Sequence, residues 1–391
     1  MEIEFWWLLA LPVFFGLGWL AARIDIKQVV SESRTLPRSY FAGLNFLLNE
    51  QQDKAIDAFI EAMKAAPETS ELHFALGSLF RRRGELDRAI RIHQNLIDDP
   101  DITDDERLQA RAELGNDYLK AGLLDRAENV FNELKETASR QLALESLLNI
   151  YQQEQNWEKA IEIANMFPNH ESISWRQNIG NFYCELASKA LAESKFETAH
   201  LHIEEALIVN PKNVRASILL GDIHAALGEY EVAIRAWRRV EVQAPLFLAL
   251  VAERIFEAYK KQDQPEQGMQ LLRAYLERHP SLDLLDEVFR WELAKSGPRA
   301  AYELVREELR RNPTLLGLDK LLEAASLTVT PEQREDVELI KQLIHAHTRR
   351  VARYRCVQCG FKARQFYWHC PACGGWETYP PKRTEEFDLT P

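Results

Sequence analysis

Small and aromatic residues recur at intervals of 34 residues through the middle of this chain. Gly43 and Gly77 are 34 residues apart, and the same interval separates Ala55 from Ala89. Within each interval, two stretches have apolar residues at the spacing of an amphipathic helix. A repeat of this length is typical of a helical hairpin that buries its apolar face only against its neighbours. The pattern therefore predicts an all-α array of stacked helix pairs.

Four segments carry the repeat most clearly. They are GLNFLLNEQQDKAIDAFIEAMKAAP, GSLFRRRGELDRAIRIHQNLI, GNDYLKAGLLDRAENVFNEL and GDIHAALGEYEVAIRAWRRVEVQAP. Small residues let the two helices of a hairpin approach, an aromatic residue fills the space between hairpins, and Pro67, Pro211 and Pro245 end second helices. These segments resemble tetratricopeptide repeats. The resemblance implies a right-handed superhelical solenoid whose concave groove holds segments of other proteins.

Weaker copies extend the array, giving eight expected repeats in residues 37–330. They pass through Tyr151 and Ala160, Ala187 and Ala199, Tyr259 and Gly268, and Phe289 and Ala301. The apolar spacing in residues 331–350 predicts one further amphipathic helix, which begins with a proline and closes the solenoid. Its apolar stripe is expected to consist of Val337, Ile340, Leu343 and Ile344.

The N-terminal residues follow a different pattern. Phe5 to Ala22 contains no charged residue, and as a helix these 18 residues would be about 27 Å long, close to the thickness of a bilayer core. Two glutamates precede the segment, whereas a cleaved signal peptide has basic residues there. The basic residues follow it, so the positive-inside rule places the N-terminus outside and the remainder in the cytoplasm. Residues 1–22 are therefore predicted to be a transmembrane anchor, followed by a juxtamembrane linker at 23–36.

The formal net charge of −12 is unevenly distributed. Residues 349–383 hold eight Lys or Arg against Glu377 alone, a balance of +7, so the remainder carries −19. An acidic body argues against nucleic-acid binding by the repeats. A reducing cytosol, which the orientation of the anchor also predicts, keeps paired cysteines free for metal.

Four cysteines near the C-terminal end form the strongest chemical signal. Cys356, Cys359, Cys370 and Cys373 follow the spacing C-x2-C-x10-C-x2-C. Two residues between thiolates let one tight turn aim both sulfurs at a single ion, and two such knuckles complete a tetrahedron. Residues 351–380 are therefore predicted to be a small four-cysteine module of rubredoxin or zinc-ribbon type, with a tail at 381–391.

Metal ligation is expected to fold this module, because about 25 residues bury too little apolar surface to fold alone. Tetrahedral sulfur suits iron or zinc, so the spacing leaves the metal open. The module has more aromatic residues than so small a core can hold, and some are expected to pack onto the last repeats. These aromatic residues are Tyr354, Phe361, Phe366, Tyr367, Trp368 and Trp376. The surrounding basic residues either neutralise the thiolates or bind anionic headgroups, a protein or RNA.

No catalytic motif stands out, and the protein is predicted not to be an enzyme. The sequence has no GxxxxGK phosphate loop, no HExxH and no GxSxG. His200, His202 and His224 are interpreted as ordinary core or surface residues of repeat helices, and Cys184 as buried packing. The acidic run at 98–106 lacks the alternating ligands and central Gly of a calcium loop, so it is interpreted as a solvated loop between repeats.

The combination of parts resembles the lipopolysaccharide assembly protein B family. The resemblance rests on LPVFFGLGWLAAR near the start, on LNFLLNEQQDKAIDAF, LFRRRGELDRAIRIHQ and FYCELA in the repeats, and on YRCVQCGF and YWHCPAC in the tail. It implies an adaptor in the inner membrane of Gram-negative bacteria, with the repeats and the metal module on the cytoplasmic side. On the matching positions, the four cysteines would be the metal ligands.

The partners are also implied by the resemblance. The adaptor would regulate lipopolysaccharide synthesis by promoting proteolysis of the deacetylase that commits precursor to lipid A. The protease would be a membrane-anchored AAA+ enzyme, and the signal would come from an inner-membrane signalling protein. The lipopolysaccharide assembly machinery is a further expected partner, and a homodimer is possible. Two alternatives from the four-cysteine motif are an electron carrier, which requires iron with a reversible couple, and an RNA-binding ribbon, which requires salt-sensitive binding.

Overall fold

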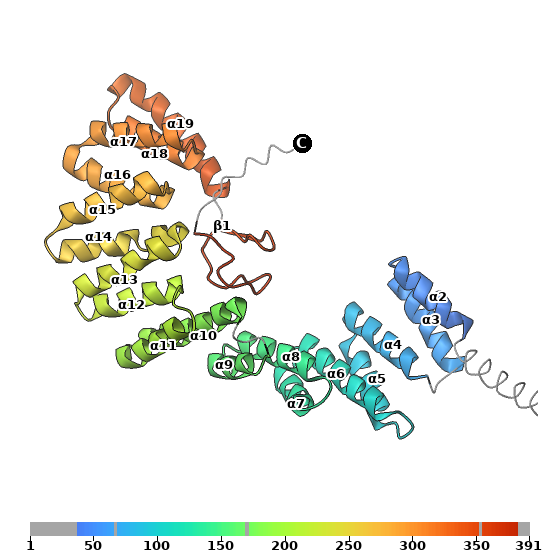
Figure 1. The fold of residues 1–391 in the computed structure, drawn as a ribbon. Helices are drawn as coiled ribbons and strands as arrows, with labels where there is room; N and C mark the ends of the chain where they lie inside the picture. The colour runs from blue at the N-terminus through green and yellow to red at the C-terminus, as the bar shows by residue number, and fades with distance from the viewer. Residues whose placement is uncertain (1–36, 66–68, 169–171, 352–353, 382–391) are drawn as a thin grey trace, which may run out of the picture. The chain divides into compact units, whose positions relative to one another are not determined.

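The computed structural model describes residues 37–65, 69–168, 172–351 and 354–381. Close contacts divide the chain into two compact units, Met1–Asn156 and Trp157–Pro391. Both are built from helices that follow one another as hairpins (Figure 1). The predicted anchor at 1–22 and linker at 23–36 lie outside the described residues, and among the described helices none is long and apolar enough to cross a bilayer.

The first unit contains seven described helices. They are α2 (Arg38–Leu48), α3 (Gln52–Ala65), α4 (Ser70–Arg83), α5 (Leu86–Asp98), α6 (Asp104–Lys120), α7 (Leu124–Leu134) and α8 (Arg140–Gln153). Successive helices pack in pairs, α2 with α3, α4 with α5 and α6 with α7. This order matches the predicted hairpins.

The close crossing inside each hairpin comes from a glycine on the first helix and a ring on the second, 16 residues later. A Cβ at Gly43 would lie 2.9 Å from the Phe59 ring, and a Cβ at Gly115 would lie 2.6 Å from the Phe131 ring. The rings of Phe59 and Phe131 are fully buried. Only glycine therefore lets the helices approach at these crossings, as the repeat pattern predicts.

The second unit contains the remaining helices. They are α9 (Trp157–Asn165), α10 (Ile173–Ala192), α11 (Phe196–Val209), α12 (Val214–Ala226), α13 (Tyr230–Gln243), the 3-10 helix η2 (Pro245–Leu250), α14 (Ala252–Lys261), α15 (Pro265–Arg278), α16 (Leu282–Ser296), α17 (Pro298–Arg311), α18 (Leu315–Ser326) and α19 (Pro331–Val351). Helices α10 and α11, and α12 and α13, form its tightest pairs. Pro211 and Pro245 follow the ends of α11 and α13, as predicted, whereas Pro67 lies outside the described residues.

Helix α19 differs in part from the expected amphipathic helix. Val337 and Ile344 are half-buried, but Ile340 and Leu343, which were expected on the same buried stripe, are 47% and 65% exposed. Among the described helices, α18 is the only one with which α19 makes extended contact. A single neighbour covers too narrow an arc of its surface to bury the whole stripe.

The acidic run at 98–106 is also only partly a loop. Its last three residues, Asp104 to Glu106, form the first turn of α6. The Thr103 hydroxyl accepts from the Glu106 amide, and the Glu106 carboxylate accepts from the Thr103 amide, which is a capping box. Carboxylates at a helix N-terminus are stabilised by the helix dipole. The acidic residues of this first turn therefore stabilise the start of α6, and their presence does not require a bound cation.

Candidate metal centre

Two similar turns place the four cysteines. The first follows β1 (Tyr354–Arg355), which pairs antiparallel with β2 (Lys362–Ala363). In this knuckle the Cys356 amide donates to the Phe361 carbonyl at 2.9 Å, and in the second knuckle the Cys370 amide donates to the Gly375 carbonyl, also at 2.9 Å. Gly360 and Gly374 close the two turns with φ of 76° and 68°. Glycine is needed at both positions because other residues rarely adopt a left-handed backbone.

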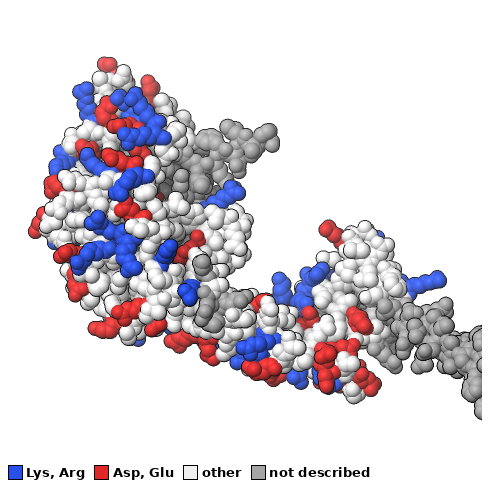
Figure 2. Space-filling view, viewed as in Figure 1, with Lys and Arg blue, Asp and Glu red and all other residues white. Residues whose placement is uncertain are grey.

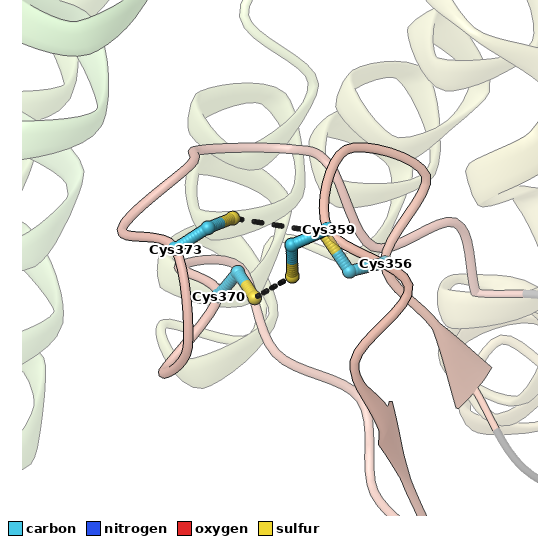
Figure 3. A group of neighbouring side chains, drawn as sticks. All are labelled: Cys356, Cys359, Cys370 and Cys373. Carbon is cyan, nitrogen blue, oxygen red and sulfur yellow. Dashed lines mark hydrogen bonds between the residues drawn. The ribbon is translucent and has the colours of Figure 1, made fainter. Parts of the chain in front are cut away.

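The structure brings the four predicted cysteines into one cluster. Their sulfur atoms all lie within 4.8 Å of one another, and Figure 3 shows them converging from the two knuckles. The Sγ atoms of Cys356 and Cys373 are 3.8 Å apart, and those of Cys359 and Cys370 are 3.7 Å apart. A tetrahedron with metal–sulfur bonds of about 2.3 Å has sulfur–sulfur edges of about 3.8 Å. The cluster is therefore consistent with one metal ion.

Each knuckle contributes one buried sulfur and one that faces solvent. Cys356 and Cys370 are buried, whereas Cys359 and Cys373 are accessible. Inside the module, the fully buried Tyr379 packs against the two buried cysteines and donates its hydroxyl to the Phe361 carbonyl at 3.1 Å. The site is thus rooted in a small core on one side and open to solvent on the other.

The surroundings favour the thiolate at Cys356 and disfavour it at Cys373. Burial disfavours the Cys356 thiolate, but hydrogen bonds with the Thr378 hydroxyl and the backbone near Cys359 outweigh burial and lower its pKa to about 6. At Cys373 the Gly375 amide favours the thiolate, yet desolvation and the neighbouring thiols raise its pKa to about 12. Four thiolates so close together repel one another, and a divalent cation removes that repulsion.

One face of the module is anchored to helices α9 and α10 by Trp376. Its ring lies edge-on to both Trp157 and Phe182, with centroid distances of 5.8 Å, and only 7% of the residue is exposed. The adjacent Glu377 accepts hydrogen bonds from the side-chain amides of Gln177 at 2.7 Å and Asn181 at 3.0 Å. A ring and a carboxylate next to it in sequence therefore fix the module to α10.

A second contact joins the module to the segment between α13 and α14. Trp368 stacks on Phe247 of η2, with centroids 5.3 Å apart and planes 3° from parallel. The Arg215 guanidinium of α12 lies 5.7 Å from the Trp368 ring. Aromatic residues of the module do pack onto the repeats, since Phe366 and Trp368 lie against the core that runs from Val214 to Ala324. Their direct ring contacts are with η2 and α12, in the middle of the unit rather than at its end. Helix α19 explains the difference, because its 21 residues span about 32 Å between the last hairpin and the module.

The other residues considered from the sequence are not part of this centre. Cys184 is fully buried, and burial raises its pKa to about 12, as expected for a packing residue. His200 and His224 approach each other edge-on at 6.0 Å, and each faces a glutamate. Among the described residues, the four cysteines are the only cluster with three or more potential metal ligands close together.

Sequence reasoning missed the residues that hold the module in place. Gln177 and Asn181 are polar residues of α10, and they are 200 and 196 residues from Glu377. One signal was present, because Glu377 is the single acid among the basic residues of 349–383. An isolated carboxylate in such a segment suggests a specific partner.

Comparisons with known proteins agree with this architecture. A family model described as rubredoxin metal binding domain matches residues 354–381. A second, described as tetratricopeptide repeat, matches residues 42–104 and 184–245. Lipopolysaccharide assembly protein B of Escherichia coli K12 is 37% identical over 382 residues, which cover 96% of this chain and 97% of the relative. The chain belongs to the lipopolysaccharide assembly protein B family. The namesake from Haemophilus influenzae is 30% identical and covers 97% of this chain and 98% of its own length.

Membership of the lipopolysaccharide assembly protein B family accounts for both parts of the described chain. The protein is an all-helical tetratricopeptide-repeat solenoid that carries a C-terminal four-cysteine module. Among solved structures, that of Naa15/Naa10 bound to HypK-THB is 16% identical and covers 79% of this chain and 53% of its own, with a TM-score of 0.38. That score is low, and the family assignment depends on the full-length relatives.

Proposed function

We propose that this protein regulates lipopolysaccharide assembly as a non-enzymatic adaptor at the inner membrane. The observation that carries the proposal is its relationship, over nearly the full length of both chains, to relatives named lipopolysaccharide assembly protein B. Repeat helices of this type bind protein segments, which suits an adaptor. On the face shown in Figure 2, basic and acidic side chains are interspersed over the repeat helices.

The adaptor is proposed to control the amount of the deacetylase that commits precursor to lipid A. It would present this enzyme to a membrane-anchored AAA+ protease, in response to an inner-membrane signalling protein. The proposal needs no chemistry from the adaptor itself. Holding two proteins together raises their effective concentration into the millimolar range when the linkers are short.

Membrane confinement is proposed to come from residues 1–22, with the N-terminus in the periplasm. The repeats at 37–330, the closing helix at 331–350 and the module at 351–380 would then lie on the cytoplasmic side. The support for this topology is the uncharged stretch from residue 5 to residue 22 and the basic residues that follow it. Confinement to two dimensions would favour encounters with a protease that is anchored in the same membrane.

The four cysteines are proposed to hold one ion, either iron or zinc. The matching sulfur–sulfur distances and the sulfur-only donor set support this assignment. When bound, the ion would cross-link the two knuckles, and four sulfur ligands leave no open position for hydrolysis. The knuckles in turn position Trp368, Trp376 and Glu377 against the repeat helices.

The proposal is tested by complementation in a Gram-negative strain depleted of its own family member. The full chain is expected to restore a low level of the deacetylase and growth, as measured by immunoblotting and by lipopolysaccharide quantification. A chain lacking residues 1–22 is expected to fold but to leave the deacetylase level high. A chain with an unrelated membrane helix in the same orientation is the control, and it is expected to restore regulation. Full regulation by the chain without any anchor would refute the membrane role.

A further inference from the structure

A pocket lies where the metal module meets the repeat helices of the second unit. It has a volume of about 210 Å³. Arg215, Leu219 and Asp222 of α12 and Arg254 of α14 form one side, and Phe366 and Trp368 of the module form the other. The pocket therefore exists only while the module is docked.

The size and lining of the pocket suit side chains of a peptide. Small-molecule sites are usually about 300–1,000 Å³, which is larger than this pocket. The two module rings and Leu219 provide apolar walls, and two guanidinium groups lie beside them. An aromatic side chain next to a carboxylate matches both features, because rings pack on rings and a guanidinium binds a carboxylate with two parallel hydrogen bonds.

Arg254 is the charged group of the lining that a ligand can reach most easily. Arg215 is 7% exposed and pairs with Glu185 at 2.7 Å, beneath the Trp368 ring. Arg254 pairs with Asp222 at 3.0 Å, yet 45% of its side chain is exposed. Each guanidinium therefore has a carboxylate partner, and Arg254 keeps an exposed side. The remaining N–H groups on that side can donate to a carboxylate of a ligand.

The chain itself contains a segment with this chemistry. Residues 383–391 are RTEEFDLTP, in which three carboxylates outnumber one arginine and flank Phe387. They lie outside the described residues and follow Pro381, which is buried in the module. The six residues from position 382 to Phe387 can span about 20 Å. A folded unit of the 28 residues at 354–381 has a radius of gyration of only about 8 Å, so the pocket is within reach.

We propose that this pocket is a peptide-binding site and that the acidic C-terminal segment 383–391 is its occupant. Phe387 would pack against the ring pair formed by Phe366 and Trp368, which contact each other edge-on with centroids 5.0 Å apart. A neighbouring carboxylate would pair with the exposed side of Arg254. A partner protein with a similar acidic and aromatic sequence would then have to displace the segment. This proposal is independent of any role in lipopolysaccharide assembly, since it concerns binding by the purified chain.

The test uses a chain that ends at residue 382 and a fluorescent synthetic peptide with the sequence of residues 383–391. Fluorescence anisotropy is expected to show saturable binding to the shortened chain. The full chain is expected to bind the same peptide at least about tenfold more weakly, because its own segment competes at an effective concentration in the millimolar range. Arg254→Gln in the shortened chain is expected to weaken binding by about tenfold.

Arg273→Gln is the matched control. Arg273 is also 45% exposed and also pairs with an acid on another helix, Glu292, but it lies away from the pocket. It is expected to leave peptide binding unchanged, and the peptide variant Phe387→Ala is expected to bind about tenfold more weakly. The occupancy would be overturned by equal binding to the full and shortened chains. The site itself would be overturned if the shortened chain bound a scrambled peptide equally well, or if Arg254→Gln had no effect.

Discussion

A buried histidine replaces the usual ring in one hairpin of the first unit. His93 stands where Phe59 and Phe131 stand in the neighbouring hairpins, and a Cβ at Gly77 would lie 2.4 Å from its Nε2. Its Nδ1 is 2.5 Å from a carboxylate oxygen of Asp117, and both side chains are fully buried. Arg81 joins Asp117 at 2.8 Å. The histidine therefore ties two adjacent hairpins together through a polar network at a position that normally holds an apolar ring.

Removing the central carboxylate is expected to destabilise this unit. Asp117→Ala would leave Arg81 without one of its two acids and His93 without its buried partner, at a cost of about 3–5 kcal/mol. The loss of unfolding free energy is measured by denaturant unfolding, with hydrogen exchange in α5 and α6 as the probe. Asp53→Ala is the control, because Asp53 is exposed and pairs with Arg83 on the surface, and it is expected to cost less than about 1 kcal/mol. Equal effects of the two substitutions would contradict the importance of the network.

The sulfur cluster makes a separate prediction for single residues. Cys370→Ser removes a buried sulfur from the cluster and is expected to abolish stoichiometric metal binding and to make residues 354–381 sensitive to protease. Metal analysis and limited proteolysis measure the two effects. Cys184→Ala, which removes a buried cysteine outside the cluster, is expected to leave the metal content unchanged. Retention of metal and protease resistance by Cys370→Ser would rule out a structural four-cysteine site.

At the scale of elements, the module and the helices are held by separable contacts. Trp376→Ala is expected to keep the metal, because the ring does not contribute to the sulfur cluster, but to free the module from α9 and α10. The loss of a ring that is only 7% exposed costs about 3–5 kcal/mol in general. Hydrogen exchange in α9 and α10 is expected to increase.

Phe361→Ala provides the comparison for that substitution. Phe361 belongs to the same module but is 39% exposed and contacts Tyr379 within the module. It is expected to leave hydrogen exchange in α9 and α10 unchanged. If both variants changed exchange there equally, the module as a whole rather than the Trp376 contact would be responsible.

The elements show how far sequence patterns extend. Four of the hairpins follow from local spacing, since the glycine and the ring that meet at their crossings are only 16 positions apart, as for Gly221 and Trp237. The knuckles are local as well, because each is closed within six residues. The attachment of the module to α10 was not predictable in this way, since a periodic pattern contains no information on which repeat receives a distant segment. The exposed apolar residues of α19 were missed for a similar reason, because the number of its neighbours is a tertiary property.

At the scale of the whole molecule, metal removal is expected to act on the second unit and to spare the first. A strong chelator would unfold the module, because the core around Cys356, Cys370 and Tyr379 is too small to fold without the ion. Trp157 and Phe182 would then lose the cover of Trp376. Tryptophan fluorescence and hydrogen exchange are expected to change within residues 157–381, and exchange in α2 to α8 is expected to stay the same. Equal loss of protection in both units would contradict this.

The long sequence separation between Glu377 and α10 also has a consequence during translation. Gln177 and Asn181 leave the ribosome 200 and 196 residues before the carboxylate that they bind. At about 5–20 residues per second, that interval lasts about 10–40 seconds. During this interval, the rings of Trp157 on α9 and Phe182 on α10 lack the cover of Trp376. In a chain whose translation stops before Trp376, they stay uncovered. A truncated chain therefore exposes an apolar surface, the rings of Trp157 and Phe182, that Trp376 covers in the complete chain.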